Sequence, residues 1–306
     1  MIYREFGKTG WQVSAIGLGT WNIGNQWGEI DDATAWDTVR AAFASGVNLF
    51  DTAESYGLPN GLSEERLGEA LAGIRHRVIL VSKVGNWGKR TGQGVPKTTV
   101  DMIRLCAHAS LHRLRTDWHD VLLCHEGNIE DPSVYLEAFA VLVEEGRLRA
   151  YGISTNSLEV LKTFNREGKC SVVQVDYSLL NRQPEEALLP YCQEHGIAVM
   201  VRGPLAKGLL SGRYDRSSVF SDDVRSSFNE GEGERAAFES MVDRVEVLKG
   251  RVQPGSEMVR AALQYTISHA AAPVAIPGAK SAEQARANAE AGQRLLAADE
   301  LEKLRV

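Results

Sequence analysis

A short stretch near the start of the chain places an acid and a phenol close together. An apolar run ends at Phe50, Asp51 follows it directly, and Tyr56 comes five residues later, beside a glycine. The pattern is typical of a buried strand that leads into a loop, with both side chains at the strand's exit. Taken alone, one acid and one tyrosine after a strand are usually ordinary loop residues. The meaning of this pair depends on what stands at the ends of the other strands.

Six expected strands end in a polar side chain that could take part in chemistry. Each side chain has an ordinary explanation when taken alone, such as a lysine that reaches solvent or a histidine paired in the core. Six together are hard to explain by packing, because a buried polar group costs free energy unless it is paired. These residues are Asp51, Lys83, His125, Ser154, Gln174 and Arg202.

This set of side chains suits the reduction of a carbonyl group. A tyrosine phenol ordinarily has a pKa of about 10 and is a weak acid at neutral pH. An ammonium beside it favours the phenolate, which makes proton donation to a developing alkoxide easier. Lys83 could supply that charge for Tyr56, with Asp51 as its partner, while His125 orients the carbonyl oxygen. No side chain can donate a hydride, so a nicotinamide or a flavin is required.

Strand and helix patterns alternate along the chain after an expected β-hairpin at residues 3–6 and 12–15. Parallel strands joined by helices form either a doubly wound sheet or a closed barrel. The strands are expected at residues 15–19, 47–50, 78–83, 121–125, 150–154, 171–175, 197–202 and 273–277. The helices are expected at residues 32–45, 63–73, 98–114, 133–145, 157–167, 185–195 and 256–269, and from about Ser281 and Ala298.

Eight strand–helix units within one domain's length favour the barrel. A doubly wound sheet would need a G-x-G-x-x-G motif after the first strand, whereas residues 17–22 lack the third glycine and the following helix. We therefore expect residues 1–306 to form one α/β domain, a (β/α)8 TIM barrel with an N-terminal β-hairpin. In such a barrel the carboxyl ends of the strands meet at one mouth.

One interval is too long for a simple crossover. The seventh expected strand ends at Arg202, and residues 209–255 then form a long loop insertion with a helical segment near residues 234–248. Long insertions in compact domains are usually functional, and this one lies beside the expected mouth. We interpret it as a lid, with disorder as the alternative.

The composition narrows the possible functions. The 306 residues are 43% apolar, enough for a sizeable core, and the net charge of −6 includes no basic block of the kind that binds nucleic acid. Neither a signal-peptide core nor an apolar run of membrane-spanning length is present. The cysteines form no C-x-x-C pair, which indicates free thiols in a reducing compartment, and a cytoplasmic protein is expected. They are Cys106, Cys124, Cys170 and Cys192.

Four segments together resemble the aldo-keto reductase family. They are DTAESYG at residues 51–57, VSK at 81–83, VLLCH at 121–125 and IPG at 276–278, and the resemblance covers essentially the whole chain. It implies an eight-stranded barrel that binds NADPH in an extended form and carries an Asp-Tyr-Lys-His tetrad. All four positions match, so the expected catalytic residues are Asp51, Tyr56, Lys83 and His125.

The resemblance also implies cofactor contacts around the mouth. Ser154 and Gln174 match the contacts to the nicotinamide carboxamide, but Thr155 replaces the usual asparagine, so one bond could shift to Asn156 or to water. Arg202 replaces an aromatic residue, and a planar guanidinium can stack similarly. Residues 203–213 match the segment that wraps the pyrophosphate. The expected contacts are Thr20, Trp21, Asp51, Ser154, Thr155, Gln174, Arg202, Gly203, Pro204, Leu205, Lys207, Gly208 and Arg213.

The adenosine end departs from the family pattern. The family's Lys-Ser and Arg positions fall on Gly278, Ala279 and Gln284. Lys280 is placed by its spacing to bind the 2′-phosphate instead, and a helix that begins here would favour a phosphate. The expected cofactor is NADP, with NADPH favoured over NADH, and its contacts at this end are Gly278, Lys280, Gln284 and Asn288.

Trp21 and Trp87 follow the first and third strands and are expected to wall the substrate site with Tyr56 and His125, although packing at the rim would place them similarly. An apolar wall indicates aldehydes or ketones with a hydrophobic side. The expected function is therefore NADPH-dependent reduction of aldehydes or ketones to alcohols, with Tyr56 as proton donor.

Two other classes of protein stay open. A lysine at a strand end can form a Schiff base, so Lys83 would also fit an aldolase-type enzyme. Channel-associated β subunits share this fold and tetrad, which leaves an NADP-binding regulatory protein with slow turnover. No metal is expected, because His108 and His112 lack the glutamate of an H-E-x-x-H motif. The only partner expected is a small carbonyl substrate, with neither nucleic acid nor membrane, and the oligomeric state is not predicted.

Overall fold

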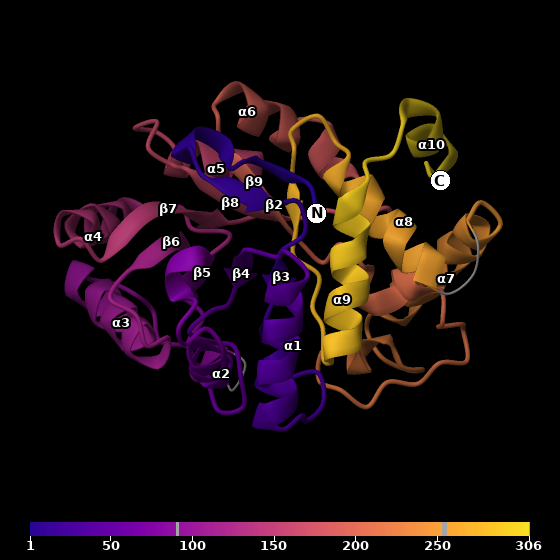
Figure 1. Cartoon of the computed structure of the whole chain (residues 1–306), viewed down its shortest axis with the longest axis horizontal. Helices are drawn as coiled ribbons and strands as arrows, with labels where there is room; N and C mark the ends of the chain where they lie inside the picture. The colour runs from indigo at the N-terminus through magenta and orange to yellow at the C-terminus, as the bar shows by residue number, and fades with distance from the viewer. Residues whose placement is uncertain (90–91, 253–255, 306) are drawn as a thin grey trace.

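Eight parallel strands form the centre of the protein (Figure 1). The computed structural model describes residues 1–89, 92–252 and 256–305. Neighbouring strands follow chain order, and bridges from Ile16 to Ala275 and from Gly19 to Gly278 join the two ends of the sheet. The expected (β/α)8 barrel is therefore confirmed. Its strands are β3 (Leu18–Gly19), β4 (Leu49–Asp51), β5 (Ile79–Val84), β6 (His119–Cys124), β7 (Leu148–Ser154), β8 (Val172–Asp176), β9 (Ala198–Arg202) and β10 (Val274–Ala275).

The expected hairpin closes one end of the barrel. Strands β1 (Tyr3–Glu5) and β2 (Gln12–Ser14) pair antiparallel, with Tyr3 opposite Ser14. Phe6, which directly follows β1, and Val13, which lies in β2, pack in one cluster with apolar side chains of the barrel strands. The hairpin therefore buries apolar surface at this end and leaves the carboxyl ends of the strands as the open mouth. The strand side chains in this cluster are Leu49, Val81, Val121, Leu123, Ala150, Val172, Ala198, Met200 and Val274.

Helices surround the sheet and bury its outer face (Figure 1). The first begins where the Asp31 side chain accepts a hydrogen bond from the backbone N–H of Thr34, and the chain reverses at Gly46 in a left-handed conformation (φ 91°). None of the helices among the described residues is long and apolar enough to cross a membrane. The helices around the sheet are α1 (Asp32–Ala44), α2 (Leu62–Ala70), α3 (Val100–Arg113), α4 (Ser133–Glu144), α5 (Leu158–Phe164), α6 (Leu188–Glu194), α8 (Ser256–Ile267), α9 (Ala282–Glu290) and α10 (Ala298–Lys303).

The insertion after β9 packs aromatic side chains that join the cluster beneath strands β8 and β9. It contains short helical turns at Ala206–Ser211 and Ser226–Phe228 and the helix α7 (Arg235–Lys249). Phe238 packs with Phe228 and Phe220 at ring-centroid distances of 5.3 and 5.5 Å. Residues 209–252 are thus packed onto the barrel through these side chains, which argues against the disordered alternative there. The last three expected insertion residues, 253–255, lie outside the described residues.

Candidate active site

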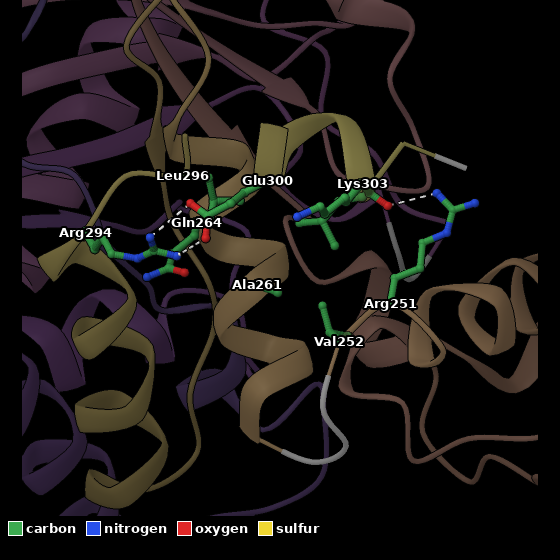
Figure 2. A pocket seen from close by; sticks show the side chains of 9 residues that line it. Arg251, Val252, Ala261, Gln264, Arg294, Leu296, Glu300 and Lys303 are labelled. Carbon is green, nitrogen blue, oxygen red and sulfur yellow. Dashed lines mark hydrogen bonds and ion pairs between the residues drawn. The ribbon is translucent and has the colours of Figure 1, made fainter. Parts of the chain in front are cut away.

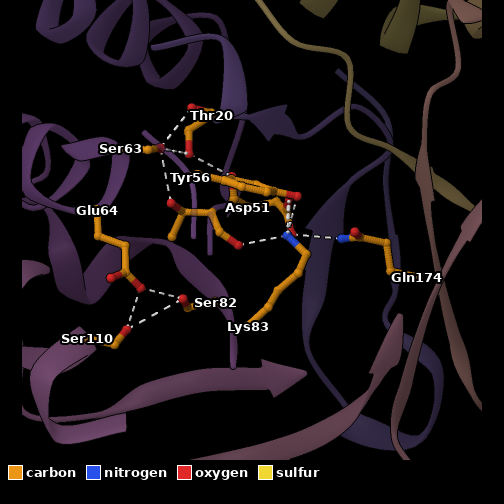
Figure 3. A network of polar contacts seen from close by, with 10 residues as sticks. Thr20, Asp51, Tyr56, Ser63, Glu64, Ser82, Lys83, Ser110 and Gln174 are labelled. Carbon is orange, nitrogen blue, oxygen red and sulfur yellow. Dashed lines mark hydrogen bonds and ion pairs between the residues drawn. The ribbon is translucent and has the colours of Figure 1, made fainter. Parts of the chain in front are cut away.

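Lys83 lies at the centre of a buried polar network (Figure 3). Its ammonium donates hydrogen bonds to Oδ2 of Asp51 at 2.8 Å, to the carbonyl oxygen of Thr52 at 2.7 Å and to the phenol oxygen of Tyr56 at 3.2 Å. An ammonium has three N–H donors, so each of them is engaged. The side chain of Lys83 is fully buried and that of Asp51 nearly so. The ammonium is therefore held against the phenol oxygen.

Burial and ion pairing act in opposite directions on these two charges. Burial lowers the pKa of Lys83, but the carboxylate of Asp51 and the phenol of Tyr56 more than reverse this effect, so the pKa lies above its ordinary value. Burial raises the pKa of Asp51, while Lys83 and Gln174 oppose that rise. Lys83 consequently remains an ammonium at neutral pH and supplies a positive charge beside Tyr56.

Aromatic neighbours fix the ring of Tyr56. The ring of Trp21 stacks on it at a centroid distance of 5.7 Å and an interplanar angle of 22°. His125, which directly follows β6, meets it edge-on at 5.9 Å and 77°. The four residues of the predicted tetrad thus lie together, as the convergence of strand ends requires.

Gln174 joins this network from β8, 123 residues along the chain from Asp51. Its side-chain N–H donates to Oδ1 of Asp51 at 2.7 Å, which leaves both carboxylate oxygens hydrogen-bonded. The other polar atom of Gln174, Oε1, is buried and has no hydrogen-bond partner among the described residues. An unpaired buried acceptor is what the N–H of a nicotinamide carboxamide could pair with. Ser154 lies opposite Gln174 in the strand register, so the residues present fit the expected group.

The side chains next to Ser154 are engaged within the protein. The hydroxyl of Thr155 donates to the carbonyl oxygen of Gly127 at 2.6 Å and accepts from the backbone N–H of Ser157 at 3.0 Å. Its hydroxyl hydrogen is therefore used inside the protein. A cofactor contact through this hydroxyl stays a prediction.

Arg202, at the end of β9, points toward two polar neighbours. Its guanidinium donates to the side-chain oxygen of Asn156 at 3.1 Å and lies 3.8 Å from a carboxylate oxygen of Asp176. The Arg202 side chain is 42% exposed, so one side of it remains open to the barrel mouth. A half-exposed planar group held by its edge is suited to stacking on a flat ligand.

The segment expected to wrap a pyrophosphate turns sharply after Gly203, Pro204 and Leu205. Ala206 and Lys207 adopt left-handed conformations with φ of 47° and 54°, followed by Gly208 at 89°. The Lys207 ammonium lies 3.3 Å from a carboxylate oxygen of Glu234 and 4.5 Å from the ring centre of Phe228. Lys207, which is predicted to bind the cofactor, is thus held to the insertion through Glu234. Arg213, at the end of the same segment, is exposed.

The predicted adenosine end borders the loop that carries Trp21. The ammonium of Lys280 donates to the carbonyl oxygen of Trp27 at 2.6 Å, and its backbone N–H donates to the side chain of Gln284 at 2.9 Å. The buried Asn288 donates to the carbonyl oxygen of Gly278 at 3.3 Å. A side chain at Gly278 would meet Oδ1 of Asn22 at 1.7 Å. A larger residue at position 278 would therefore require the Asn22 side chain to move.

Several residues of the network were missed by sequence reasoning. The hydroxyl of Ser63, at the start of α2, donates to the carbonyl oxygen of Thr20 at 2.8 Å and lies 3.1 Å from the hydroxyl of Thr52. The next residue, Glu64, is fully buried and accepts hydrogen bonds from Ser82, Ser110 and Arg113. The two residues therefore connect α2 to both strands that carry Asp51 and Lys83 (Figure 3). The available signal was a serine–glutamate pair at a helix start, which indicates only a cap.

The two predicted tryptophans of the substrate wall have different surroundings. Trp21 meets the unpredicted Trp27 edge-on at 5.2 Å, and the guanidinium of Arg225 in the insertion lies 5.5 Å from the ring centre of Trp27. Trp87 lies under the guanidinium of Arg113 at 5.4 Å. Trp21 and Trp27 therefore link the tetrad to the insertion.

A separate hollow of about 250 Å³ lies between α8 and α10 (Figure 2). In the lining of this hollow, the guanidinium of Arg294 is paired with both carboxylate oxygens of Glu300 at 2.9 and 2.6 Å. Arg251 donates to the carbonyl oxygens of Lys303 and Arg305. None of the predicted site residues lines this hollow, and we assign the candidate active site to the barrel mouth. Within the described part of the chain, no group of three or more His, Cys, Asp or Glu side chains could hold a metal ion.

Comparison with known proteins agrees with this geometry. A model of the Aldo/keto reductase family matches residues 15–305. The chain is 33% identical to the aldo-keto reductase YhdN of Bacillus subtilis (strain 168), over 95% of this chain and 88% of that protein. It is 34% identical to the NADH-specific methylglyoxal reductase of Escherichia coli (strain K12), over 70% of each.

Solved structures extend the similarity to the fold. The holo form of the aldo-keto reductase AKR11C1 from Bacillus halodurans has a TM-score of 0.82 at 31% identity, covering 99% of this chain and 95% of that chain. An aldo-keto reductase from Klebsiella pneumoniae in complex with NADPH has a TM-score of 0.74 at 30% identity, covering 99% and 94%. The chain belongs to the aldo/keto reductase family of oxidoreductases.

Proposed function

We propose that this protein reduces aldehydes or ketones to alcohols with NADPH, and that Tyr56 donates the proton. The observation that carries the proposal is the 3.2 Å contact between the Lys83 ammonium and the phenol oxygen of Tyr56. A buried positive charge at this distance favours the phenolate that forms when the proton leaves. Asp51 holds the ammonium in place, and His125 borders the phenol where a carbonyl oxygen would lie.

The cofactor would supply the hydride, and the side chains around the mouth would hold it. The unpaired Oε1 of Gln174 is suited to the carboxamide, the half-exposed Arg202 to the nicotinamide face, and residues 203–213 to the pyrophosphate. Lys280 would bind the 2′-phosphate. The choice of NADPH is supported by the Klebsiella relative in complex with NADPH. Because the Escherichia coli relative is NADH-specific, the cofactor of this protein needs a direct test.

The Schiff-base alternative is disfavoured by the state of Lys83. An imine forms from a neutral amine, and the pKa of Lys83 is raised while all three of its N–H donors are engaged. We further propose that residues 1–306 act as one barrel domain, and that the protein is cytoplasmic. The four free cysteines are in keeping with a reducing compartment.

A panel of aldehydes and ketones assayed in parallel with NADPH and NADH tests the proposed function. We expect carbonyl-dependent oxidation of NADPH that is faster than that of NADH. Binding of NADPH without turnover of any carbonyl would instead support the regulatory-protein alternative. Covalent trapping of a carbonyl on Lys83 by borohydride, without cofactor, would support the aldolase.

A further inference from the structure

Gln26 connects two parts of the active-site wall. Its side-chain oxygen accepts a hydrogen bond from the indole N–H of Trp21 and a second one, at 3.0 Å, from the backbone N–H of Gly57. Trp21 stacks on the ring of Tyr56, and Gly57 directly follows Tyr56 in the chain. Gln26 is 3% exposed, so both bonds are shielded from water.

The orientation of this amide is set by its partners. Both partners are donors, so the amide oxygen must face them and the nitrogen must face away. That nitrogen is buried and has no hydrogen-bond partner among the described residues. An unpaired buried donor is unfavourable, and an apolar side chain of similar size would avoid it. Packing alone therefore does not explain a glutamine at position 26, whereas its two accepted bonds do.

The position of Tyr56 depends on what surrounds its ring. Trp21 covers one face, His125 meets an edge, and Lys83 contacts the phenol oxygen. Of these neighbours, Trp21 begins the short 3-10 helix Trp21–Gly24, and the hydrogen bond to Gln26 restrains how its indole can turn. A displacement of a reacting group by about 1 Å can reduce a rate by roughly a hundredfold.

We propose that Gln26 is a positioning residue for Tyr56, acting through Trp21 and Gly57. The inference rests on the proposed function, because proton donation by Tyr56 is part of that function. Since Trp21 also walls the predicted substrate site, loss of Gln26 is expected to change both kcat and the KM of the carbonyl. Trp21 is also an expected cofactor contact, so NADPH affinity is measured separately from kcat and KM.

Two substitutions of similar size separate the effects. Gln26→Met removes the acceptor, and we expect kcat to fall at least about tenfold and the carbonyl KM to rise. Gln26→Glu keeps an oxygen for both N–H groups, and we expect it to recover most of kcat. A role in packing alone would give Gln26→Met and Gln26→Glu the same kcat.

Asn25 provides a matched control in the same loop. Its side-chain oxygen accepts from the backbone N–H of Ile30 at 3.1 Å and from the guanidinium of Arg66 at 2.9 Å. Its φ of 69° suits glycine, so Asn25→Gly removes these loop contacts without backbone strain. We expect kcat and KM within about twofold of the wild-type values. A loss equal to that of Gln26→Met would overturn the proposal, as would a Gln26→Met variant with unchanged kcat and KM.

A readout independent of turnover separates this inference from the proposed function. In protein labelled with ¹⁵N-tryptophan, Trp21→Phe identifies the Trp21 indole resonance, and solvent exchange of that N–H is then measured. We expect slow exchange in the wild type and in Gln26→Glu, and at least tenfold faster exchange in Gln26→Met. Equal exchange in all three overturns the role of Gln26. Failure of the wild type to reduce any carbonyl overturns the proposed function, while the exchange result still stands.

Discussion

The ammonium nitrogen of Lys83 lies 3.2 Å from the phenol oxygen of Tyr56 and 2.8 Å from a carboxylate oxygen of Asp51. The two contacts differ in what their loss would leave behind. Removing the phenol hydroxyl leaves the buried ion pair intact, whereas removing the ammonium leaves a buried carboxylate without its cation. Substitutions of Tyr56 and Lys83 should therefore affect stability differently even where both reduce turnover.

Tyr56→Phe removes the hydroxyl alone. We expect NADPH binding to persist and turnover to fall by at least about a hundredfold, the low end for general acid catalysis. The midpoint of urea unfolding should fall less than in Lys83→Met, because the stacking surface for Trp21 and the ion pair are kept and only one N–H of Lys83 loses its acceptor. The measurements are steady-state kinetics, a fluorescence titration and an unfolding curve. Near-normal kcat in this variant would remove the tyrosine from the mechanism.

Lys83→Met should nearly abolish activity and also destabilise the fold, because an unpaired buried charge at Asp51 costs about 3–5 kcal/mol. Asp51→Asn should weaken activity through a misplaced lysine. The double variant Asp51→Asn, Lys83→Met removes both charges, so we expect it to regain stability without regaining activity. Kinetics across pH and urea unfolding of the three variants test this account. A wild-type rate and pH profile in Lys83→Met would show that the electrostatic explanation is wrong.

Lys280→Ala tests the choice of cofactor. A charge-assisted phosphate contact contributes about 1.5–3 kcal/mol, so NADPH binding should weaken roughly tenfold or more while NADH binding hardly changes. Arg286, exposed on the helix α9 that follows Lys280, supplies the control variant Arg286→Ala, which should leave both affinities unchanged. Fluorescence titrations of both cofactors decide the question. Equal losses for NADPH and NADH would move the phosphate site elsewhere, to Arg213 or Arg225.

His119 is expected to make the stability depend on pH. It is 1% exposed, and burial lowers its pKa to about 3 from an ordinary value of about 6.5. Above about pH 6.5 the histidine is neutral in both states, so its contribution to stability is fully present. As the pH falls from 6.5 toward 3, only the unfolded chain takes up the proton, and stability is lost by about 1.4 kcal/mol per pH unit.

Urea unfolding of His119→Gln between pH 7.5 and 5 checks this expectation. The variant should be less stable at pH 7.5, where a buried group has been altered, but its stability should fall less steeply with acid. His76→Gln, at an exposed histidine, should keep the wild-type slope. Parallel curves for the wild type and His119→Gln would contradict the buried, neutral histidine.

The fold and the tetrad could be predicted because they depend on periodic patterns. Alternating strands and helices define the barrel, and a side chain at the end of one strand is brought near the ends of the others. Asp51, Lys83 and His125 were found in this way. The first strand is shorter than expected, Leu18–Gly19, because Ile16 pairs only through an isolated bridge to Ala275.

The contacts of loop residues could not be predicted in this way. Gln26 reaches Trp21 and Gly57 through a loop that turns at Asn25 in a left-handed conformation, and no periodicity encodes such a turn. Gln174 was expected at the nicotinamide, but its bond to Asp51 links positions 123 residues apart. Such contacts depend on the closed barrel, so a local pattern does not reveal them.

The two ends of the sheet meet at a narrow seam. Strands β3 and β10 have two residues each, and the backbone N–H groups of Gly17 and Gly19 donate to the carbonyl oxygens of Ala275 and Pro277 across it. A dinucleotide reaching from Thr20 to the segment after Gly278 would span this seam and fasten the first strand to the last. Bound NADPH should then hold the first and last strands of the barrel together. Hydrogen exchange at Gly17 and Gly19 should slow when it binds, and the melting temperature should rise with its concentration.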